Sequence, residues 1–407
     1  MNRKKLAGKT NFKEIKQKGE NDIIKYHQNK MKKYFFTSES VTEGHPDKLC
    51  DTIADTILDK YIENDNKSKV AIEVLAAKNE IVVAGQVTSN ISIDTKKMEK
   101  IIRETIQKIG YDNSQTDIDY RTCKIYINIT EQSPDISKGV DIGGAGDQGI
   151  MFGYACDETE NYMPYPIEIA HKLAKKLTDV RRGNEIPYLR PDGKTQVTIE
   201  YENGIPKRID TILISTQYEK NTDIITLKKD IKEKVINKVV PKEKIDQNTK
   251  IYINPTGSFV IGGPLGDTGL TGRKIIMDTY GGYSRHGGGA FSGKDGTKVD
   301  RSAAYMARHI AKNIVANKIA KKCEIQLSYA IGMKEPISIF ANTFGTGKIS
   351  EEEIVKLIKN NFDLTPQGII KYLQLDKPIF SKTTNYGHFG KSDLEWEKII
   401  KINKINK

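Results

Sequence analysis

Residues 255–297 form a long stretch that is dense in glycine and has neither helical nor strand periodicity. A connection of this length without regular structure is uncommon in a compact domain unless it has a function. Charged residues lie among its glycines and just beyond them: Asp267, Arg273, Lys274, Arg285, His286, Lys294 and Lys298. Glycine lets backbone amides approach a ligand closely, and neighbouring cations neutralise an anionic one. The composition favours a polyphosphate site over the alternative, a flexible linker, since a linker rarely carries this many arginines and lysines beside an apolar residue such as Phe259.

Two familiar nucleotide-binding patterns are incomplete in this chain. Gly288 to Lys294 matches a P-loop up to the lysine, but Asp295 follows where a magnesium-binding serine or threonine is required. The segment 144–149 (GAGDQG) matches the dinucleotide fingerprint, yet a loop precedes it and no βαβ unit surrounds it. The sequence therefore favours neither a P-loop enzyme nor a dinucleotide-binding domain.

A third informative segment, residues 37–48 (TSESVTEGHPDK), leads into a predicted amphipathic helix over 46–63. His45, Asp47 and Lys48 lie at its start, where free amides and the helix dipole attract anions. A histidine and a lysine there suit phosphate, and an aspartate suits a divalent cation held against it. The alternative is an ordinary capped helix without a ligand.

The remaining elements alternate between helices and strand pairs. Helices are predicted over 96–109, 167–180, 224–240 and 299–320, and strand pairs over 69–88, 196–217 and 323–343. The dipeptide Asn203-Gly204 indicates a β-hairpin in the second pair. This order predicts an α+β fold with mostly antiparallel pairing.

Charge and composition narrow the class of protein. The 407 residues include no apolar run long enough to span a membrane, and the four cysteines form no C-x-x-C pair. We therefore expect a cytoplasmic protein without a zinc knuckle or disulfide framework. Residues 1–33 carry eight of the twelve net positive charges, which predicts a solvated, disordered leader. An arm attracted to RNA or lipid is the alternative, and Met31 is a candidate natural start.

Four motifs together resemble the S-adenosylmethionine synthetase (methionine adenosyltransferase) family. They are residues 44–48 (GHPDK), 144–149 (GAGDQG), 262–274 (GGPLGDTGLTGRK) and 287–295 (GGGAFSGKD). The resemblance extends from about residue 33 to the segment 386–390 (YGHFG) and covers most of the chain.

The resemblance implies three similar α+β domains about a pseudo-threefold axis, with mixed or antiparallel sheets and helices on one face. Its boundaries predict a basic leader at 1–32 and domains at 33–133, 144–261 and 262–400. It also implies an enzyme in which the sulfur of L-methionine attacks the 5′-carbon of ATP. The triphosphate leaves and is hydrolysed to pyrophosphate and phosphate. The expected assembly is a homodimer with active sites at the interface, doubled to a tetramer, without nucleic acid or membrane as a partner.

The site residues follow from the same resemblance, position by position. The catalytic set is His45, Lys194, Arg273 and Lys294. The ATP set is His45, Asp192, Lys194, Ser258, Phe259, Asp267, Arg273, Lys274, Ala290 and Lys294. The methionine set is Gln86, Gln132, Asp147, Asp267 and Lys298. Two Mg²⁺ ions per site are implied on Asp47 and Asp300, and K⁺ on Glu73.

Two positions depart from the family pattern. Gln86 stands where the family usually has a methionine-contacting glutamate, and Ser258 stands where an arginine usually precedes the phenylalanine. These changes leave open a synthetase-like regulatory subunit, and the loops alone would also allow a different ATP-dependent phosphotransferase. An active synthetase is favoured because His45, both aspartates and the other phosphate-binding cations are present.

Overall fold

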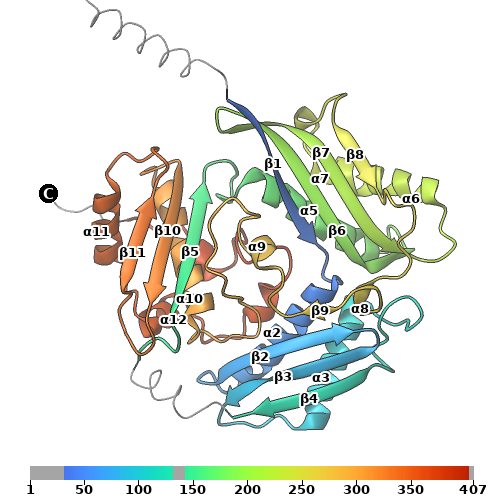
Figure 1. Ribbon diagram of the computed structural model, residues 1–407, viewed down its shortest axis with the longest axis horizontal. Coiled ribbons are helices and arrows are strands. Elements are labelled where there is room, and N and C mark those ends of the chain that lie inside the picture. Colours follow the sequence, from blue (N-terminus) through green and yellow to red (C-terminus); the bar gives the residue numbers. More distant parts are fainter. Residues whose placement is uncertain (1–31, 132–142, 403–407) are drawn as a thin grey trace, which may run out of the picture.

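The computed structural model describes residues 32–131 and 143–402. Its strands form three separate sheets around a central region that holds the short helix α9 (Figure 1). Residues 1–31, which are all but the last residue of the predicted basic leader, and Gln132 lie outside the described residues.

The first sheet has the strand order β4-β3-β2-β9. Strands β2 (Lys69–Ala77) and β3 (Glu80–Thr88) are antiparallel, β4 (Lys124–Thr130) runs parallel to β3, and the two-residue β9 (Gly269–Leu270) pairs with β2. Helix α2 (Pro46–Asn64) packs on this sheet, and α3 (Thr95–Ile109) packs on α2. Leu49, Ile53 and Ile57 are fully buried because they share the face of α2 that meets the sheet.

The second sheet has the order β1-β6-β7-β8 and is backed by α5 (Tyr165–Arg182). Strand β1 (Lys33–Val41) pairs along its whole length with β6 (Leu189–Glu202), and β8 (Lys250–Ile253) runs parallel to β7 (Ile205–Tyr218). Asn203 and Gly204 both have positive φ and close the predicted hairpin between β6 and β7. The predicted helix over 224–240 is divided into α6 (Ile224–Asp230), η1 (Ile231–Ile236, a π-helix) and α7 (Asn237–Val239), and the 3₁₀ turn η2 (Lys242–Lys244) follows.

The third sheet has the order β11-β10-β5, all antiparallel. It combines β5 (Gly149–Cys156), β10 (Lys322–Tyr329) and β11 (Ser338–Asn342), and α10 (Val299–Ala316) packs on it. The small residues Ala303, Ala304 and Ala307 of α10 are buried, which allows this close packing. Helices α11 (Glu351–Asn361) and α12 (Pro366–Leu373) and the 3₁₀ turns η3 (Phe380–Lys382) and η4 (Glu395–Glu397) complete the C-terminal region.

Each sheet takes one strand from a distant part of the chain. β1 leaves the N-terminal region to join β6, β5 joins β10, and β9 returns to β2 (Figure 1). The prediction of an α+β fold with mixed and antiparallel sheets is confirmed. The prediction that 255–297 lacks regular structure was wrong in detail, since α8 (Gly263–Gly266), β9 and α9 (Ile275–Asp278) lie within it. These elements have two to four residues, too few to produce a periodic pattern.

Candidate active site

The N-terminus of α2 holds the first group of candidate residues. His45 is the N-cap, Pro46 occupies the first helical turn, and Asp47 follows, all of them buried. The His45 Nδ1 accepts a hydrogen bond from the Asp47 amide at 3.1 Å. Burial, reinforced by the charge of Lys274, lowers the pKa of His45 to about 3. The ring is therefore neutral, and because Nδ1 accepts, its proton lies on Nε2.

Asp47 is the centre of this group. Its Oδ1 accepts the Leu270 amide at 3.0 Å and lies 3.6 Å from Arg273, while its Oδ2 binds the Lys274 ammonium at 2.6 Å. Burial acts to raise the pKa of Asp47, but the Lys274 and Leu270 hydrogen bonds outweigh it and the net shift is downward. Asp47 is thus an ionised carboxylate beside two cations.

Four aspartates on α2 at four-residue spacing tie the distant loops to this helix. Asp47 binds Leu270 N–H, Asp51 binds Gly272 N–H at 2.9 Å, and Asp55 binds Gly293 N–H at 2.8 Å. Asp59 accepts the amides of Phe380 and Ser381. Sequence reasoning missed this role, although the repeat of aspartate at every fourth position places all four carboxylates along one helix face.

A second group lies around Lys294. Its ammonium binds Asp300 Oδ2 at 2.6 Å, and Asp300 is in the first turn of α10. The backbone of Lys294 forms an antiparallel bridge with Ala71 of β2, and Ala71 pairs in turn with Gln86 of β3. Burial raises the pKa of Glu73, and the nearby positive charge of Lys294 opposes that shift. Gln86, Glu73 and Lys294 therefore share the outer face of the first sheet.

The two groups meet where Ala290 packs on Gly272. A Cβ at Gly272 would come within 2.5 Å of the Ala290 Cβ, and its φ of +78° also requires glycine. Gly272 precedes Arg273, and Ala290 lies four residues before Lys294. Glycine at this contact therefore brings the two cation-bearing loops together.

A third set of candidates lies near Asp192, which is buried. Its Oδ2 accepts the Gly263 amide at 2.9 Å, its Oδ1 has no hydrogen-bond partner among the described residues, and burial raises its pKa to about 6. The charge of Asp267 adds to this rise and that of Lys194 opposes it, so both lie near Asp192. Lys194 also lowers the pKa of His45, which connects this set to the first group.

The remaining candidates are less closely joined to these groups. Lys298 binds Asp295 at 2.7 Å. Phe259 is partly buried against the core of the second sheet, Ser258 is exposed, and Asp147 is exposed beside Gln148. Gln132 lies outside the described residues.

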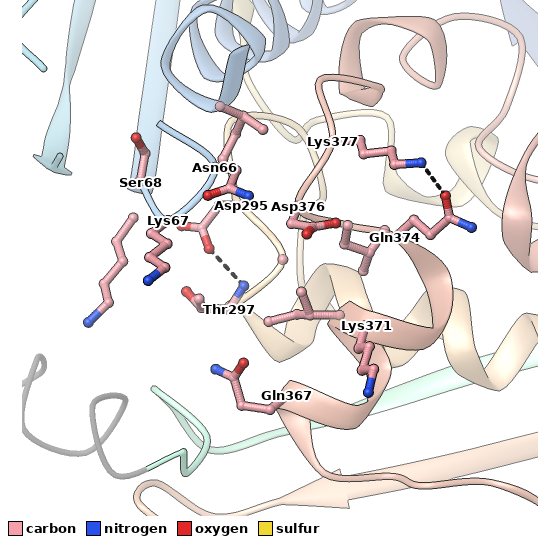
Figure 2. A pocket seen from close by; sticks show the side chains of 15 residues that line it. Asn66, Lys67, Ser68, Asp295, Thr297, Gln367, Lys371, Gln374, Asp376 and Lys377 are labelled. Carbon is pink, nitrogen blue, oxygen red and sulfur yellow. Dashed lines mark hydrogen bonds between the residues drawn. The ribbon is translucent and has the colours of Figure 1, made fainter. Parts of the chain in front are cut away.

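Two cavities adjoin the site. One, of about 400 Å³, is lined by Arg273 and Lys274 and by strand residues that include Thr37 and Gln196. The other, of about 610 Å³, lies between the end of α2, the loop 295–297 and α12 (Figure 2). Lys67, Lys371 and Asp295 line it, but none of its lining residues belongs to the candidate set. The first cavity is therefore the better match to an anionic ligand, because the candidate residues Arg273 and Lys274 line it.

The carboxylates of the site suit a metal ion that binds together with the phosphates of a substrate. Among residues 32–131 and 143–402, no group of three or more His, Cys, Asp or Glu side chains could hold a metal ion by itself. Mg²⁺, however, is usually bound by one or two carboxylates together with substrate phosphates and water. Asp47 and Asp300, each ion-paired with a lysine, fit that mode of binding.

No helix in the described part of the chain is long and apolar enough to cross a membrane.

Comparison with known proteins gives matches along nearly the whole chain. The models of the N-terminal, central and C-terminal domains of S-adenosylmethionine synthetase match residues 33–134, 142–259 and 261–398. An S-adenosylmethionine synthase of Clostridium botulinum (strain Alaska E43 / Type E3) is 56% identical over 391 residues, which are 92% of this chain and 99% of that protein. The chain therefore belongs to the S-adenosylmethionine synthetase family.

Proposed function

We propose that this chain synthesises S-adenosylmethionine from ATP and L-methionine and hydrolyses the released triphosphate to pyrophosphate and phosphate. A bond forms between the methionine sulfur and C5′ of ATP while the C5′–O bond breaks, and the bonding electron pair leaves on the triphosphate oxygen. The observation that carries the proposal is the meeting of Asp47, Lys274 and Arg273 with the Lys294–Asp300 loop at the Gly272–Ala290 contact.

The residues suit this chemistry because the difficulty lies in the leaving group. A thioether sulfur carries no proton, so no general base is needed, and catalysis depends on alignment and on stabilising negative charge on the triphosphate. Lys194, Arg273, Lys274 and Lys294 are proposed to supply the positive charge. The Nε2–H of neutral His45 is proposed to donate to the departing oxygen, since its Nδ1 is already occupied by the Asp47 amide.

The family's requirement for a divalent metal is assigned here to Asp47 and Asp300, with Mg²⁺ as the proposed ion and two ions per site. When bound, the metal neutralises charge on the phosphate oxygens. Glu73 is the proposed ligand of K⁺, because it shares the outer face of the first sheet with Gln86 and Lys294.

The other candidates are assigned to the two substrates. Asp192, Phe259, Ser258 and the backbone of Ala290 are proposed to contact ATP, with Phe259 stacking on adenine. Asp147 and Asp267 suit the methionine ammonium, Lys298 suits its carboxylate, and Gln86 and Gln132 complete that set. Asp267, which is near Asp192, also belongs to the ATP set.

The proposal is tested by incubating the purified protein with ATP, L-methionine, Mg²⁺ and K⁺ and measuring three products. S-adenosylmethionine, pyrophosphate and phosphate are expected in equal amounts. ATP binding without an adenosyl product would instead indicate a regulatory subunit. Phosphate without S-adenosylmethionine would indicate an ATP- or triphosphate-hydrolysing relative.

Asp192→Asn is expected to raise the free energy of unfolding at pH 7 while it weakens ATP binding. Burial raises the pKa of Asp192 to about 6, so at pH 7 the folded protein still holds an ionised carboxylate in its interior. Each unit by which the pKa is raised corresponds to about 1.4 kcal/mol of lost stability in the ionised form. The amide oxygen of asparagine still accepts the Gly263 N–H. The folded-state pKa is raised, so wild-type stability increases as the pH falls through 6 and the advantage of the variant disappears by about pH 4. Urea unfolding at pH 7 and pH 4, with the KM for ATP, measures both effects; an advantage that persists at pH 4 would contradict the explanation.

Gln86→Glu is expected to lower the KM for methionine several-fold. Gln86 lies on the outer face of β3, in the row that Ala71 and Lys294 continue. A charge-assisted hydrogen bond contributes about 1.5–3 kcal/mol and a neutral one about 0.5–1.5 kcal/mol, so the added charge strengthens contact with the ammonium. An unchanged KM for methionine would count against a direct contact at this position.

A homodimer is proposed from the outer face of the first sheet, and the doubling to a tetramer is proposed from the family resemblance alone. Leu270, Leu75, Val82 and Tyr126 pair in one continuous row across all four strands, and each is 37–51% exposed. Glu73, Gln86 and Lys294 share this face, so a partner that covers the apolar row would also cover part of the candidate site.

The four cysteines are buried and free, which supports the proposed cytoplasmic location.

Val82→Arg is expected to convert the dimer to monomers with loss of activity, because it places a charge in the middle of the apolar row. Light scattering coupled to size-exclusion chromatography measures the mass. Ile225→Arg is the control, since Ile225 is 74% exposed on α6 and lies outside this sheet. A Val82→Arg protein that remains dimeric would show that the interface lies elsewhere.

A further inference from the structure

Asp55 of α2 and Arg301 of α10 form an ion pair that is fully buried. Both side chains have no exposed surface, and they join through two bonds, Nη1 to Oδ1 at 2.7 Å and Nη2 to Oδ2 at 2.9 Å. A buried pair of this kind often adds little net stability, because removing two charges from water costs about as much as their attraction returns. Its presence therefore calls for another explanation.

The pair holds the backbone on both sides of Gly293. Asp55 Oδ1 accepts the Gly293 amide at 2.8 Å. Arg301 Nη1 donates to the carbonyl oxygens of Phe291 and Lys294, each at 3.0 Å. The same two side chains thus fix the short segment that ends at Lys294.

Further contacts fix the orientation of the pair itself. Thr384 Oγ1 donates to Asp55 Oδ2 at 2.8 Å, Arg301 donates to Thr383 and Tyr305, and its guanidinium lies 4.4 Å from the centre of the Phe380 ring. On the opposite side of the segment, Gly293 presses on β2, where a Cβ would come within 2.0 Å of the Ile72 carbonyl oxygen. The backbone before Lys294 is therefore held between the ion pair and the sheet, and the lysine side chain alone extends toward Asp300.

We propose that Asp55 and Arg301 are positioning residues for Lys294: they hold its backbone so that its ammonium is already in place to contact the triphosphate when the substrate binds. This rests on the proposed function in one respect, the role of Lys294 at the triphosphate. A displacement of about 1 Å in a catalytic group can reduce a rate about 100-fold, so a rigid support has a measurable effect.

The chain offers a matched control on the same helix. Arg308 of α10 forms an equally buried pair with Glu397, through bonds of 3.0 and 2.9 Å. Its remaining hydrogen bonds go to the carbonyl oxygens of Tyr154, Asn161 and Tyr162, none of which is in the glycine-rich loop. Loss of this pair should destabilise the protein without moving Lys294.

The experiment compares Asp55→Asn with Glu397→Gln in the full chain. We expect both to lower the melting temperature, but only Asp55→Asn to reduce kcat for hydrolysis of added inorganic triphosphate, by at least tenfold with KM within twofold. Amide hydrogen exchange provides a readout that does not depend on activity: Asp55→Asn should accelerate exchange within 287–298, and Glu397→Gln within 154–163.

The outcomes separate this inference from the proposed function. If the wild type makes no S-adenosylmethionine, the proposed function fails, while the exchange data still decide whether the pair holds the loop. If both variants lose activity and protection alike, the pair is merely structural and the inference is overturned. Where Asp55→Asn does not fold, Arg301→Lys against Arg308→Lys repeats the comparison, because lysine keeps the charge but loses the fork that reaches Phe291 and Lys294.

Discussion

Replacing Lys294 with methionine is expected to reduce hydrolysis of the bound triphosphate by about 10²–10³-fold, the usual effect of removing one charge-stabilising donor. Lys294 is the proposed triphosphate cation of the Asp300 group, and its ammonium is only partly exposed. Formation of S-adenosylmethionine should fall less, since Arg273 and Lys274 remain beside Asp47. Rapid-quench measurements of a single turnover would show S-adenosylmethionine accumulating together with intact triphosphate.

Lys298→Met is the matched control for this experiment. Lys298 is four residues away in the same loop, is similarly exposed, and binds Asp295 instead of Asp300. Its loss should raise the KM for methionine and leave triphosphate hydrolysis within a few-fold of wild type. If Lys294→Met hydrolyses triphosphate as fast as Lys298→Met, Lys294 does not have the proposed role.

Lys48→Met is expected to have the largest effect on stability, a loss of about 3–5 kcal/mol in the free energy of unfolding. The Lys48 ammonium is fully buried and is bound by Asp278 and, at 2.9 Å, by Asp51. Burial already raises the pKa of Asp278 to about 7 in the presence of this lysine. Without it, two carboxylates lie in the interior with no cation between them.

The pH dependence distinguishes this cause from a simple packing defect. The folded-state pKa of Asp278 is raised, so the folded protein takes up protons that the unfolded chain does not. The deficit of the variant relative to wild type should therefore shrink as the pH falls from 8 to 5.5 in urea unfolding experiments. Lys60→Met on the same helix is the control, because its pair with Glu63 is exposed and should change stability by less than about 1 kcal/mol. A deficit that is equal at both pH values would indicate lost packing instead.

Local pattern was enough to predict most elements of the fold. The spacing of Leu49, Ile53 and Ile57 predicts α2, and Asn203-Gly204 predicts the β6–β7 turn, because both signals depend on neighbouring residues. The partners of the strands could not be predicted in this way. A strand pattern states which face is buried but not which strand lies beside it, and the two residues of β9 carry no pattern at all.

The candidate site was predictable as a set of residues but not as an arrangement. The motifs place His45, Asp47 and Lys294 in the set; helix-end chemistry indicated phosphate and metal roles for the first two, and the resemblance gave Lys294 its role. That Asp47 binds Lys274, and that Asp55 binds Gly293, depends on loops more than two hundred positions away in sequence. Aspartates at every fourth position of an amphipathic helix suggest a solvated face. The backbone amides that bind these buried carboxylates come from distant loops, and only the fold places them there.

The sharing of strands between sheets has a consequence for how the protein is made. During synthesis β1 leaves the ribosome early, but its partner β6 follows only after β2, β3, α3, β4, β5 and α5 have emerged. The edge of β2 likewise waits for β9, and β5 waits for β10. The nascent chain therefore carries open strand edges until most of it has been translated, and such edges are sites of aggregation. A chain truncated before β6 would therefore complete none of the three sheets, because each of them would lack a strand that is made later.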